Sequence, residues 1–334
     1  MDITIFGAGA MGVLLGARLA NAGNRVCFID QPGQVEEARK HGLKLSSAHG
    51  MDASIEKPNI SVNPADFGTQ DLVILAVKAH HIPAVAPLLG PLLKDDTAIL
   101  TLQNGLPWWY FYRHGGEYEG RRLKSLDPDG TIAACIDVSR VIGCTAYPAA
   151  EVIAPGIVHH VEGDRFTLGE LDGSDSERCK AVATTLIASG FKSYVIDDIR
   201  AELWLKAWGA LSFNPISALT RATMEDICLS PHTRWLAAEL MREAQAVANR
   251  LGVHFRHTIE KRLEGARKVG AHKTSMLQDV EKGNSLEIDA LLGSVLELAE
   301  LTATPAPLLR STYACCKLLN EKSGAASRAS SQPA

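Results

Sequence analysis

The most constraining feature of this chain is a glycine-rich turn close to its start. An apolar run, Ile3–Phe6, leads directly into Gly7-Ala8-Gly9-Ala10-Met11-Gly12, and Met11–Asn21 then carries apolar residues at helical spacing. A strand, a GxGxxG turn and a helix in this order form the first unit of a nucleotide-binding parallel sheet. The free N–H groups and positive dipole end of such a helix attract phosphate. The residues expected to bind the pyrophosphate of a dinucleotide are Gly7, Ala8, Gly9, Ala10, Met11 and Gly12.

A second apolar run, Arg25–Ile29, ends in Asp30, 18 residues after Gly12. At this spacing a carboxylate accepts hydrogen bonds from the adenosine ribose, and it repels the 2′-phosphate that distinguishes NADP from NAD. Gln31 follows, so no Arg adjoins Asp30, although Arg39 and Lys40 on the next helix could compensate in part. The pattern predicts NAD or NADP as cofactor, with NAD favoured. The alternative is that Asp30 only caps a turn or helix.

Strand-like and helical runs alternate through the first half of the chain, and the second half is almost entirely helical. This order predicts an α/β N-terminal Rossmann-type doubly wound sheet followed by an all-α C-terminal domain. We expect a dinucleotide-binding domain at 1–197, a helical substrate and catalytic domain at 198–322, and a flexible Ser- and Ala-rich tail at 323–334. Further expected elements are strands at 72–77, 97–102, 140–147, 156–161 and 165–168, and a helix at 82–93.

Composition narrows the function classes. A net charge of −4 without a basic block argues against nucleic acid and anionic membranes as partners. No apolar run approaches the ~18 residues of a membrane span. Seven dispersed cysteines without a CxxC pair indicate reduced thiols, and the eleven histidines form no ligand set, so we expect a cytoplasmic protein without a metal.

Lys206 is the one charge in the apolar helical segment 203–214. Ala210 and Asn214 follow at four and eight residues, so the three share a helix face. A lysine in apolar surroundings can protonate a carbonyl oxygen as hydride arrives. The alternative is a lysine that extends along the helix to solvent.

Two more polar groups stand at element ends. Glu287 starts a strongly periodic apolar helix, where an acid is also favoured by the helix dipole alone. Asn104, in Gln103-Asn104-Gly105, follows a strand of the parallel sheet, where ligands usually bind. An Asn-Gly turn chosen for backbone reasons is the alternative there.

Over nearly its whole length the chain resembles the ketopantoate reductase (2-dehydropantoate 2-reductase) family. The matching segments are Gly7–Gly12, Ala76-Val77-Lys78, Gln103-Asn104-Gly105, Lys206 to Asn214-Pro215, and Ser275-Met276-Leu277-Gln278-Asp279 with Glu287-Ile288-Asp289. The resemblance implies an active site in the cleft between the two domains. It also implies Lys206 as general acid, Glu287 as its supporting acid, Asn104, Asn214 and Ser275 at the substrate, and Lys78 at the cofactor.

Three departures from the family pattern bear on substrate and cofactor. Ala210 stands where an Asn is common, Asp30-Gln31 stands where an Arg often binds the NADP phosphate, and an aromatic insertion, Trp108–Tyr112, follows Asn104. Ala210 and the insertion together predict weak use of ketopantoate and a bulkier or more apolar 2-oxo acid. The aromatic run could instead pack internally or form a homodimer.

Three functions remain open from the sequence. The first is a ketopantoate-reductase-like NAD(P)H-dependent reductase of a small 2-oxo acid, favoured by Lys206 with Glu287. The second is an NAD-dependent D-2-hydroxyacid dehydrogenase that acts on a bulkier apolar acid, favoured by Asp30 and Ala210. The third is a non-catalytic dinucleotide-binding sensor, which Ala210 alone favours.

Overall fold

The computed structural model describes the backbone of residues 1–47, 50 and 52–330, and side chains up to residue 323. The chain divides into two compact units. The N-terminal unit comprises residues 1–103, 108–122 and 129–199, and the C-terminal unit comprises 104–107, 123–128 and the chain from Arg200 onward. The break at Ile199 lies beside the expected boundary at 197. The sequence did not predict that the short segments 104–107 and 123–128 belong to the C-terminal unit.

Hydrogen bonds explain why these two short segments belong to the C-terminal unit. The backbone N–H of Leu106 donates to the carbonyl oxygen of Ala290 at 3.0 Å. The Glu297 carboxylate accepts the N–H groups of Lys124 and Ser125 at 2.9 and 2.8 Å. Both short segments are therefore bound to residues that come more than 150 positions later.

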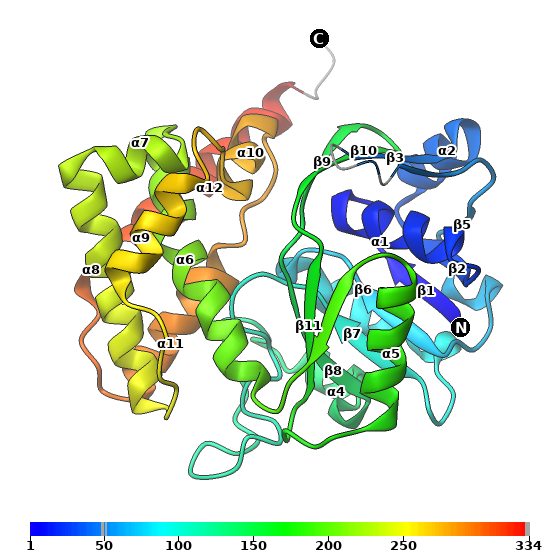
Figure 1. Cartoon of the computed structure of the whole chain (residues 1–334), viewed down its shortest axis with the longest axis horizontal. Helices are drawn as coiled ribbons and strands as arrows, with labels where there is room; N and C mark the ends of the chain where they lie inside the picture. The colour runs from blue at the N-terminus through cyan, green and yellow to red at the C-terminus, as the bar shows by residue number, and fades with distance from the viewer. Residues whose placement is uncertain (48–49, 51, 331–334) are drawn as a thin grey trace. The chain divides into compact units, whose positions relative to one another are not determined.

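A mixed eight-stranded sheet forms the centre of the N-terminal unit (Figure 1). Its six consecutive parallel strands run β5-β2-β1-β6-β7-β8, and β11 pairs antiparallel with β8 and parallel with β12. If these six strands are numbered in chain order, their order in the sheet is 3-2-1-4-5-6, which is that of dinucleotide-binding folds. In this protein the switch point of that order lies between β1 and β6. The bounds are β1 Asp2–Phe6, β2 Arg25–Ile29, β5 Asn59–Ser61, β6 Leu72–Leu75, β7 Ala98–Thr101, β8 Val141–Ala146, β11 Arg165–Glu170 and β12 Lys192–Val195.

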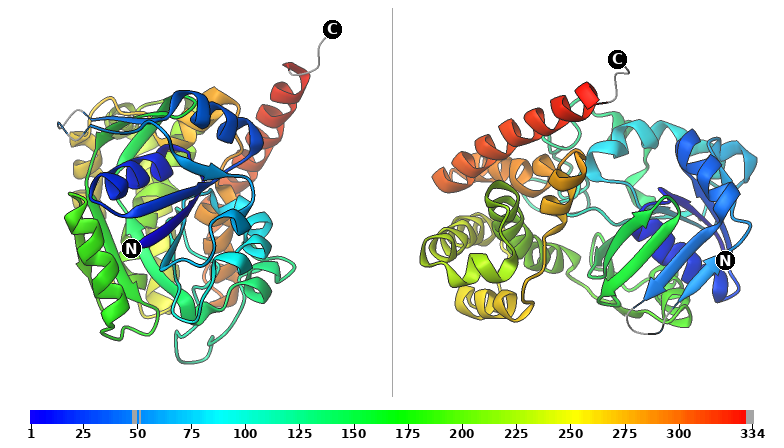
Figure 2. Two further views of the ribbon diagram at one scale, coloured as in Figure 1. Left: turned by 90° about the vertical axis from the view of Figure 1, so that its right-hand side faces the viewer. Right: turned by 90° about the horizontal axis from the view of Figure 1, so that it is seen from above.

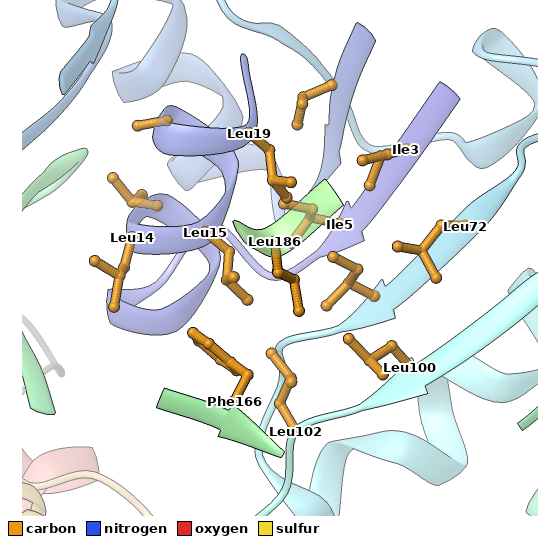
Figure 3. Packing of buried hydrophobic residues seen from close by; sticks show 14 of the residues in the cluster. Ile3, Ile5, Leu14, Leu15, Leu19, Leu72, Leu100, Leu102, Phe166 and Leu186 are labelled. Carbon is orange, nitrogen blue, oxygen red and sulfur yellow. The ribbon is translucent and has the colours of Figure 1, made fainter. Parts of the chain in front are cut away.

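Helix α1 (Ala10–Asn21) is buried on nearly every side, because it also contacts a second sheet. That sheet has the order β4-β3-β10-β9. Its strands are β3 Leu43–Ser47, β4 Ala53–Ile55, β9 Ala149–Ala154 and β10 Ile157–Glu162, of which β9 and β10 form a hairpin. Figure 3 shows how side chains of α1 meet those of the main sheet: Leu14, Leu15 and Leu19 pack with Ile3, Ile5, Leu72, Leu100 and Phe166, all essentially inaccessible to solvent. Of the four strands, only β10 was expected from the sequence.

The helix expected at 82–93 is largely absent. Helix α3 covers only Ile82–Val85, and single 3₁₀ turns follow at Ala86–Leu88 and Gly90–Leu92. Pro87 and Pro91 lack the N–H that a continuing α-helix needs, and their rings clash with the preceding turn. Apolar spacing alone therefore gave a wrong helix here. The other helices of this unit are α2 Pro32–His41, α4 Thr131–Cys135 and α5 Glu177–Ala188.

The aromatic run after Asn104 lies inside the N-terminal unit. Trp108 is 3% exposed, and Trp109, Tyr110 and Phe111 are fully buried. The indole N–H of Trp109 donates to the Thr101 hydroxyl at 3.1 Å. These side chains fill a core, as the packing interpretation held. The proposal that they line a site for a bulkier acid is not supported.

The described part of the C-terminal unit contains helices and no strand. Helix α8 (Pro231–Arg250) contacts α7, α9, α11 and α12. Helix α12 continues to Ser330, seen as the red helix in Figure 2, although the sequence predicts a tail from residue 323. Alanine in this stretch favours helix; residues 331–334 lie outside the described part. The remaining bounds are α6 Ile199–Thr220, α7 Met224–Leu229, α9 Ile259–Lys268, α10 Ser275–Lys282, a π-helix Asp289–Gly293, α11 Ser294–Leu301 and α12 Pro307–Ser330.

Candidate active site

The glycine-rich turn has the shape that a pyrophosphate requires. Gly7 has φ +98°, and a Cβ there would come within 3.1 Å of the Ala76 carbonyl oxygen. A Cβ on Gly12 would overlap the carbonyl oxygen of Gly7, so close packing of α1 against the turn needs a glycine there. At Gly9 nothing lies within 4 Å of the place a Cβ would occupy. The turn thus leaves open space at the N-terminus of α1, and the residues present fit a dinucleotide.

Asp30 holds the end of β2 against this turn. Its Oδ2 accepts the N–H of Ala8 at 2.5 Å, and its Oδ1 accepts the N–H of Gln31 at 2.7 Å. The carboxylate therefore does cap a turn, as the alternative interpretation held. Because an ionised carboxylate has about four acceptor positions, it can still accept ribose hydroxyls.

The two cations that could offset the charge of Asp30 contact other groups. Arg39 donates to the Ile60 carbonyl oxygen at 2.8 Å, and Lys40 pairs with Glu36 at 2.7 Å. Neither side chain makes a hydrogen bond or ion pair with Asp30 among the described residues.

Lys78 follows β6 at the switch point and precedes the 3₁₀ turn Ala79–His81. The pKa of His81 is lowered by burial first and then by the positive charge of Lys78, and Asp30 opposes this shift. His81 is thus close enough to both Lys78 and Asp30 to interact with each electrostatically. His81 was not selected from the sequence; its place just after the strand end at Ala76-Val77-Lys78 was the only signal.

In the C-terminal unit, three side chains form a hydrogen-bonded chain. Lys206 Nζ donates to Asn104 Oδ1 at 2.8 Å, and Asn104 Nδ2 donates to Glu287 Oε2 at 3.3 Å. All three residues are half-buried. The Asn104 amide therefore links the ammonium to the carboxylate, with its oxygen toward the donor and its nitrogen toward the acceptor.

A close backbone approach places Asn104. Gly105 has φ +83°, and a Cβ there would overlap the carbonyl oxygen of Ala290. The next N–H, that of Leu106, donates to the same oxygen. The glycine of Gln103-Asn104-Gly105 is thus required for backbone reasons, and that backbone also brings Asn104 to Glu287.

Helix α6 presents Lys206 on its less buried face. Lys206, Ala210 and Asn214 are half-buried, whereas the opposite face carries the buried Trp208. The indole N–H of Trp208 donates to the Met241 carbonyl oxygen at 2.7 Å, and its ring stacks on Phe255 at 4.3 Å between centroids. These contacts hold α6 against α8 and the loop after it.

Two expected substrate residues lie outside the hydrogen-bonded chain. Ser275 is exposed in the first turn of α10, which Thr274 caps by accepting the N–H of Leu277. Asn214 lies two turns after Lys206 on α6. Within the described residues, neither side chain forms a hydrogen bond with Lys206, Asn104 or Glu287.

Two family models match this chain, one in each half. The family model described as ketopantoate reductase PanE/ApbA matches residues 3–173, and the model of its C-terminal part matches residues 198–320. The chain belongs to the ketopantoate reductase family. A curated member, the 2-dehydropantoate 2-reductase of Mesorhizobium japonicum, is 45% identical over 97% of this chain and 99% of that protein. The chain is accordingly an oxidoreductase.

Solved structures of the family have the same fold. A Ralstonia solanacearum MolK2 protein provisionally identified as a ketopantoate reductase has a TM-score of 0.91 at 34% identity, covering 96% of this chain and 98% of that one. The 2-dehydropantoate 2-reductase of Geobacter metallireducens GS-15 has a TM-score of 0.84 at 27% identity, covering 95% and 99%. D-mandelate dehydrogenase, at 21% identity and a TM-score of 0.81 over 97% of this chain and 99% of that one, shares the fold.

None of the helices in the described residues is both long and apolar enough to cross a bilayer. Within the same residues, no group of three or more His, Cys, Asp or Glu side chains is placed to hold a metal ion. The seven cysteines, all within the described part, are free thiols.

Proposed function

We propose that the chain is an NAD(P)H-dependent reductase of a small 2-oxo acid, with Lys206 as the proton donor. The observation that carries this proposal is the hydrogen-bonded chain from Lys206 through Asn104 to Glu287. Family membership supports the reaction class, and the glycine-rich turn of the N-terminal unit supports the dinucleotide.

The reaction adds a hydride to C2 of the acid and a proton to the oxygen on that carbon. A bound reduced nicotinamide supplies the hydride. The Lys206 ammonium hydrogen-bonds the ketone oxygen and gives it a proton as negative charge develops there. Asn104 orients Lys206, and Glu287, as the acceptor at the far end, fixes which way the Asn104 amide faces. The product is the 2-hydroxy acid.

Ketopantoate is the first substrate to consider, because the 45% identical relative is named for its reduction. One observation favours the second candidate, an NAD-dependent D-2-hydroxyacid dehydrogenase for a bulkier apolar acid. Ala210, on the same face of α6 as Lys206, offers no hydrogen bond to the terminal hydroxyl that ketopantoate carries.

We further propose that NAD(H) is preferred over NADP(H). Asp30 stands at the end of β2 with its charge uncompensated by Arg39 or Lys40. Dissociation constants from nicotinamide fluorescence titration test this, and Asp30→Ala with Gln31→Arg should move the preference toward NADP(H). A preference of the native protein for NADPH of tenfold or more would contradict it.

We also propose a cytoplasmic homodimer. The ketopantoate reductase of Staphylococcus aureus is described as dimeric. Light scattering coupled to size-exclusion chromatography measures the mass directly, and a value near the 35.9 kDa of one chain would contradict the dimer.

A panel assay tests the reaction itself. Oxidation of NADH or NADPH is followed at 340 nm against 2-oxo acids that include ketopantoate, branched aliphatic acids and phenylglyoxylate. Turnover of at least one acid is expected. Tight cofactor binding without turnover of any acid would favour the non-catalytic sensor instead.

A further inference from the structure

A π-helix begins two residues after Glu287. It covers Asp289–Gly293, and the α-helix resumes at Ser294. π-Helical turns are rare, and they occur often at functional sites. Here the Ala290 carbonyl oxygen receives both the N–H of Leu106 at 3.0 Å and the Ser294 hydroxyl at 2.7 Å. The segment that carries Glu287 is therefore also the segment on which the Asn104 turn rests.

Asp289, the first residue of the π-helix, is tied to α12 by two side chains. Its Oδ1 accepts the Tyr313 hydroxyl at 2.7 Å, and its Oδ2 lies 3.2 Å from Lys317 Nζ. Tyr313 and Lys317 are four residues apart, so they project from one face of α12. Two donors on one rigid helix thus define the position of a single carboxylate.

The surroundings of Asp289 are built around this contact. A Cβ on Gly293 would lie 3.2 Å from Asp289 Oδ1 and 3.3 Å from the Tyr313 ring, so the glycine leaves the room that the two side chains use. Burial and the Asp289 carboxylate raise the pKa of Tyr313 to about 12. The Tyr313 hydroxyl consequently remains a hydrogen-bond donor over the whole range in which enzymes are assayed.

We propose that Asp289, held by Tyr313 and Lys317, is a positioning residue that fixes the π-helix and thereby the contact of Asn104 with Glu287. Among the described residues, the Asp289 side chain forms no hydrogen bond or ion pair with Lys206 or Asn104; it acts through the backbone of residues 287–290. The effect on turnover rests on the proposed function, whereas the effect on the Asn104 turn does not.

Hydrogen exchange tests the positioning without any assay of activity. Exchange of residues 104–107 and 289–294 is measured by mass spectrometry in the native protein, Asp289→Asn, Tyr313→Phe and Glu300→Gln. Glu300→Gln is the matched control, because it removes a different ion pair to α12, that of Glu300 on α11 with Arg310 at 2.8 Å. Asp289→Asn removes the carboxylate and should speed exchange of both segments by about tenfold. Tyr313→Phe removes one of its hydrogen bonds and should speed exchange of the same segments. Glu300→Gln should leave both unchanged.

Unchanged exchange at 104–107 in both Asp289→Asn and Tyr313→Phe would overturn the positioning role. The milder Tyr313→Phe change removes one hydroxyl only, so it supplies the answer if Asp289→Asn fails to fold. Equal acceleration in Glu300→Gln would also overturn the proposal, because the loss of any ion pair to α12 would then suffice.

Turnover supplies the catalytic readout. With an acid that the native enzyme reduces, Asp289→Asn should lower kcat by about tenfold or more and raise the isotope effect of 4-deuterated cofactor, while the cofactor KM changes less than about twofold. A purely structural role would lower the melting temperature and leave kcat per folded molecule and the isotope effect unaltered, which overturns the catalytic consequence. If exchange responds as expected but the native protein reduces no acid, the proposed function fails and the positioning stands.

Discussion

At the residue scale, Lys206 has a partner that a solvent-directed lysine would lack. Its Nζ donates to Asn104 Oδ1 at 2.8 Å, and its stem starts from a helix fixed by the buried Trp208. Lys206→Ala should lower kcat by about 10² to 10⁴-fold, the range for a lost general acid. The dissociation constant of the cofactor should hardly change. Stopped-flow hydride transfer and fluorescence titration measure the two quantities.

Lys261, exposed on α9, offers the matched control. Lys261→Ala should retain native turnover. Glu287→Gln should also reduce turnover, because a neutral amide is a weaker acceptor for Asn104 Nδ2. Should Lys206→Ala keep most of its activity, Lys206 would be a structural lysine and the proposed mechanism would be wrong.

Ala210 governs substrate choice in a second prediction. It lies one turn from both Lys206 and Asn214 on the half-buried face of α6. A buried substrate hydroxyl without a partner costs about 1–3 kcal/mol. Ala210→Asn should therefore raise kcat/KM for ketopantoate, which carries a terminal hydroxyl besides its 2-oxo group, by on the order of tenfold. For an apolar 2-oxo acid the same change should bring no gain. Efficient reduction of ketopantoate by the native enzyme would show that another residue already supplies this hydrogen bond.

At the scale of elements, the junction of the Asn104 turn with the π-helix depends on Gly105. A methyl group at this position would overlap the Ala290 carbonyl oxygen, and φ +83° is itself unfavourable for alanine. Gly105→Ala should lower the melting temperature and lower kcat by more than about tenfold, since Asn104 would be displaced. Calorimetry and steady-state kinetics give both values.

Gly265→Ala is the control for a glycine substitution in the same unit. Gly265 lies on α9, has no positive φ, and nothing lies within 4 Å of its Cβ position. Alanine there should raise stability by about 0.4–1 kcal/mol through the unfolded state. Native-like turnover of Gly105→Ala would mean that the turn can move away from Ala290 without consequence.

At the scale of the whole molecule, cofactor binding should stabilise the fold by mass action. A ligand at 100 times its dissociation constant adds about 2.7 kcal/mol to the free energy of unfolding. From the proposed preference for NAD at Asp30, NAD⁺ should raise the melting temperature more than NADP⁺ at the same concentration. The variant with Asp30→Ala and Gln31→Arg should reverse the order. Equal shifts in the native protein would remove Asp30 from cofactor selection.

Local patterns in the sequence were sufficient for features that depend on neighbouring residues. Apolar runs and periods predicted the strands β1, β2 and β8 and the common helix face of Lys206, Ala210 and Asn214. The backbone conformations open to glycine predicted the turn Gly7–Gly12 between β1 and α1. The family resemblance added Asn104 and Glu287 as residues of one site.

Only the tertiary structure decided which distant residues meet. The sequence separation is 102 residues between Asn104 and Lys206 and 183 between Asn104 and Glu287, and no local period reports such a pairing. The second sheet likewise joins β3 to β10 across more than 100 residues. Burial of Trp108–Phe111 and the tie of Asp289 to α12 belong to the same class. These contacts depend on how whole helices and strands pack. Residues far apart in the sequence meet only where the apolar surface buried between their elements offsets the entropy of closing the chain between them.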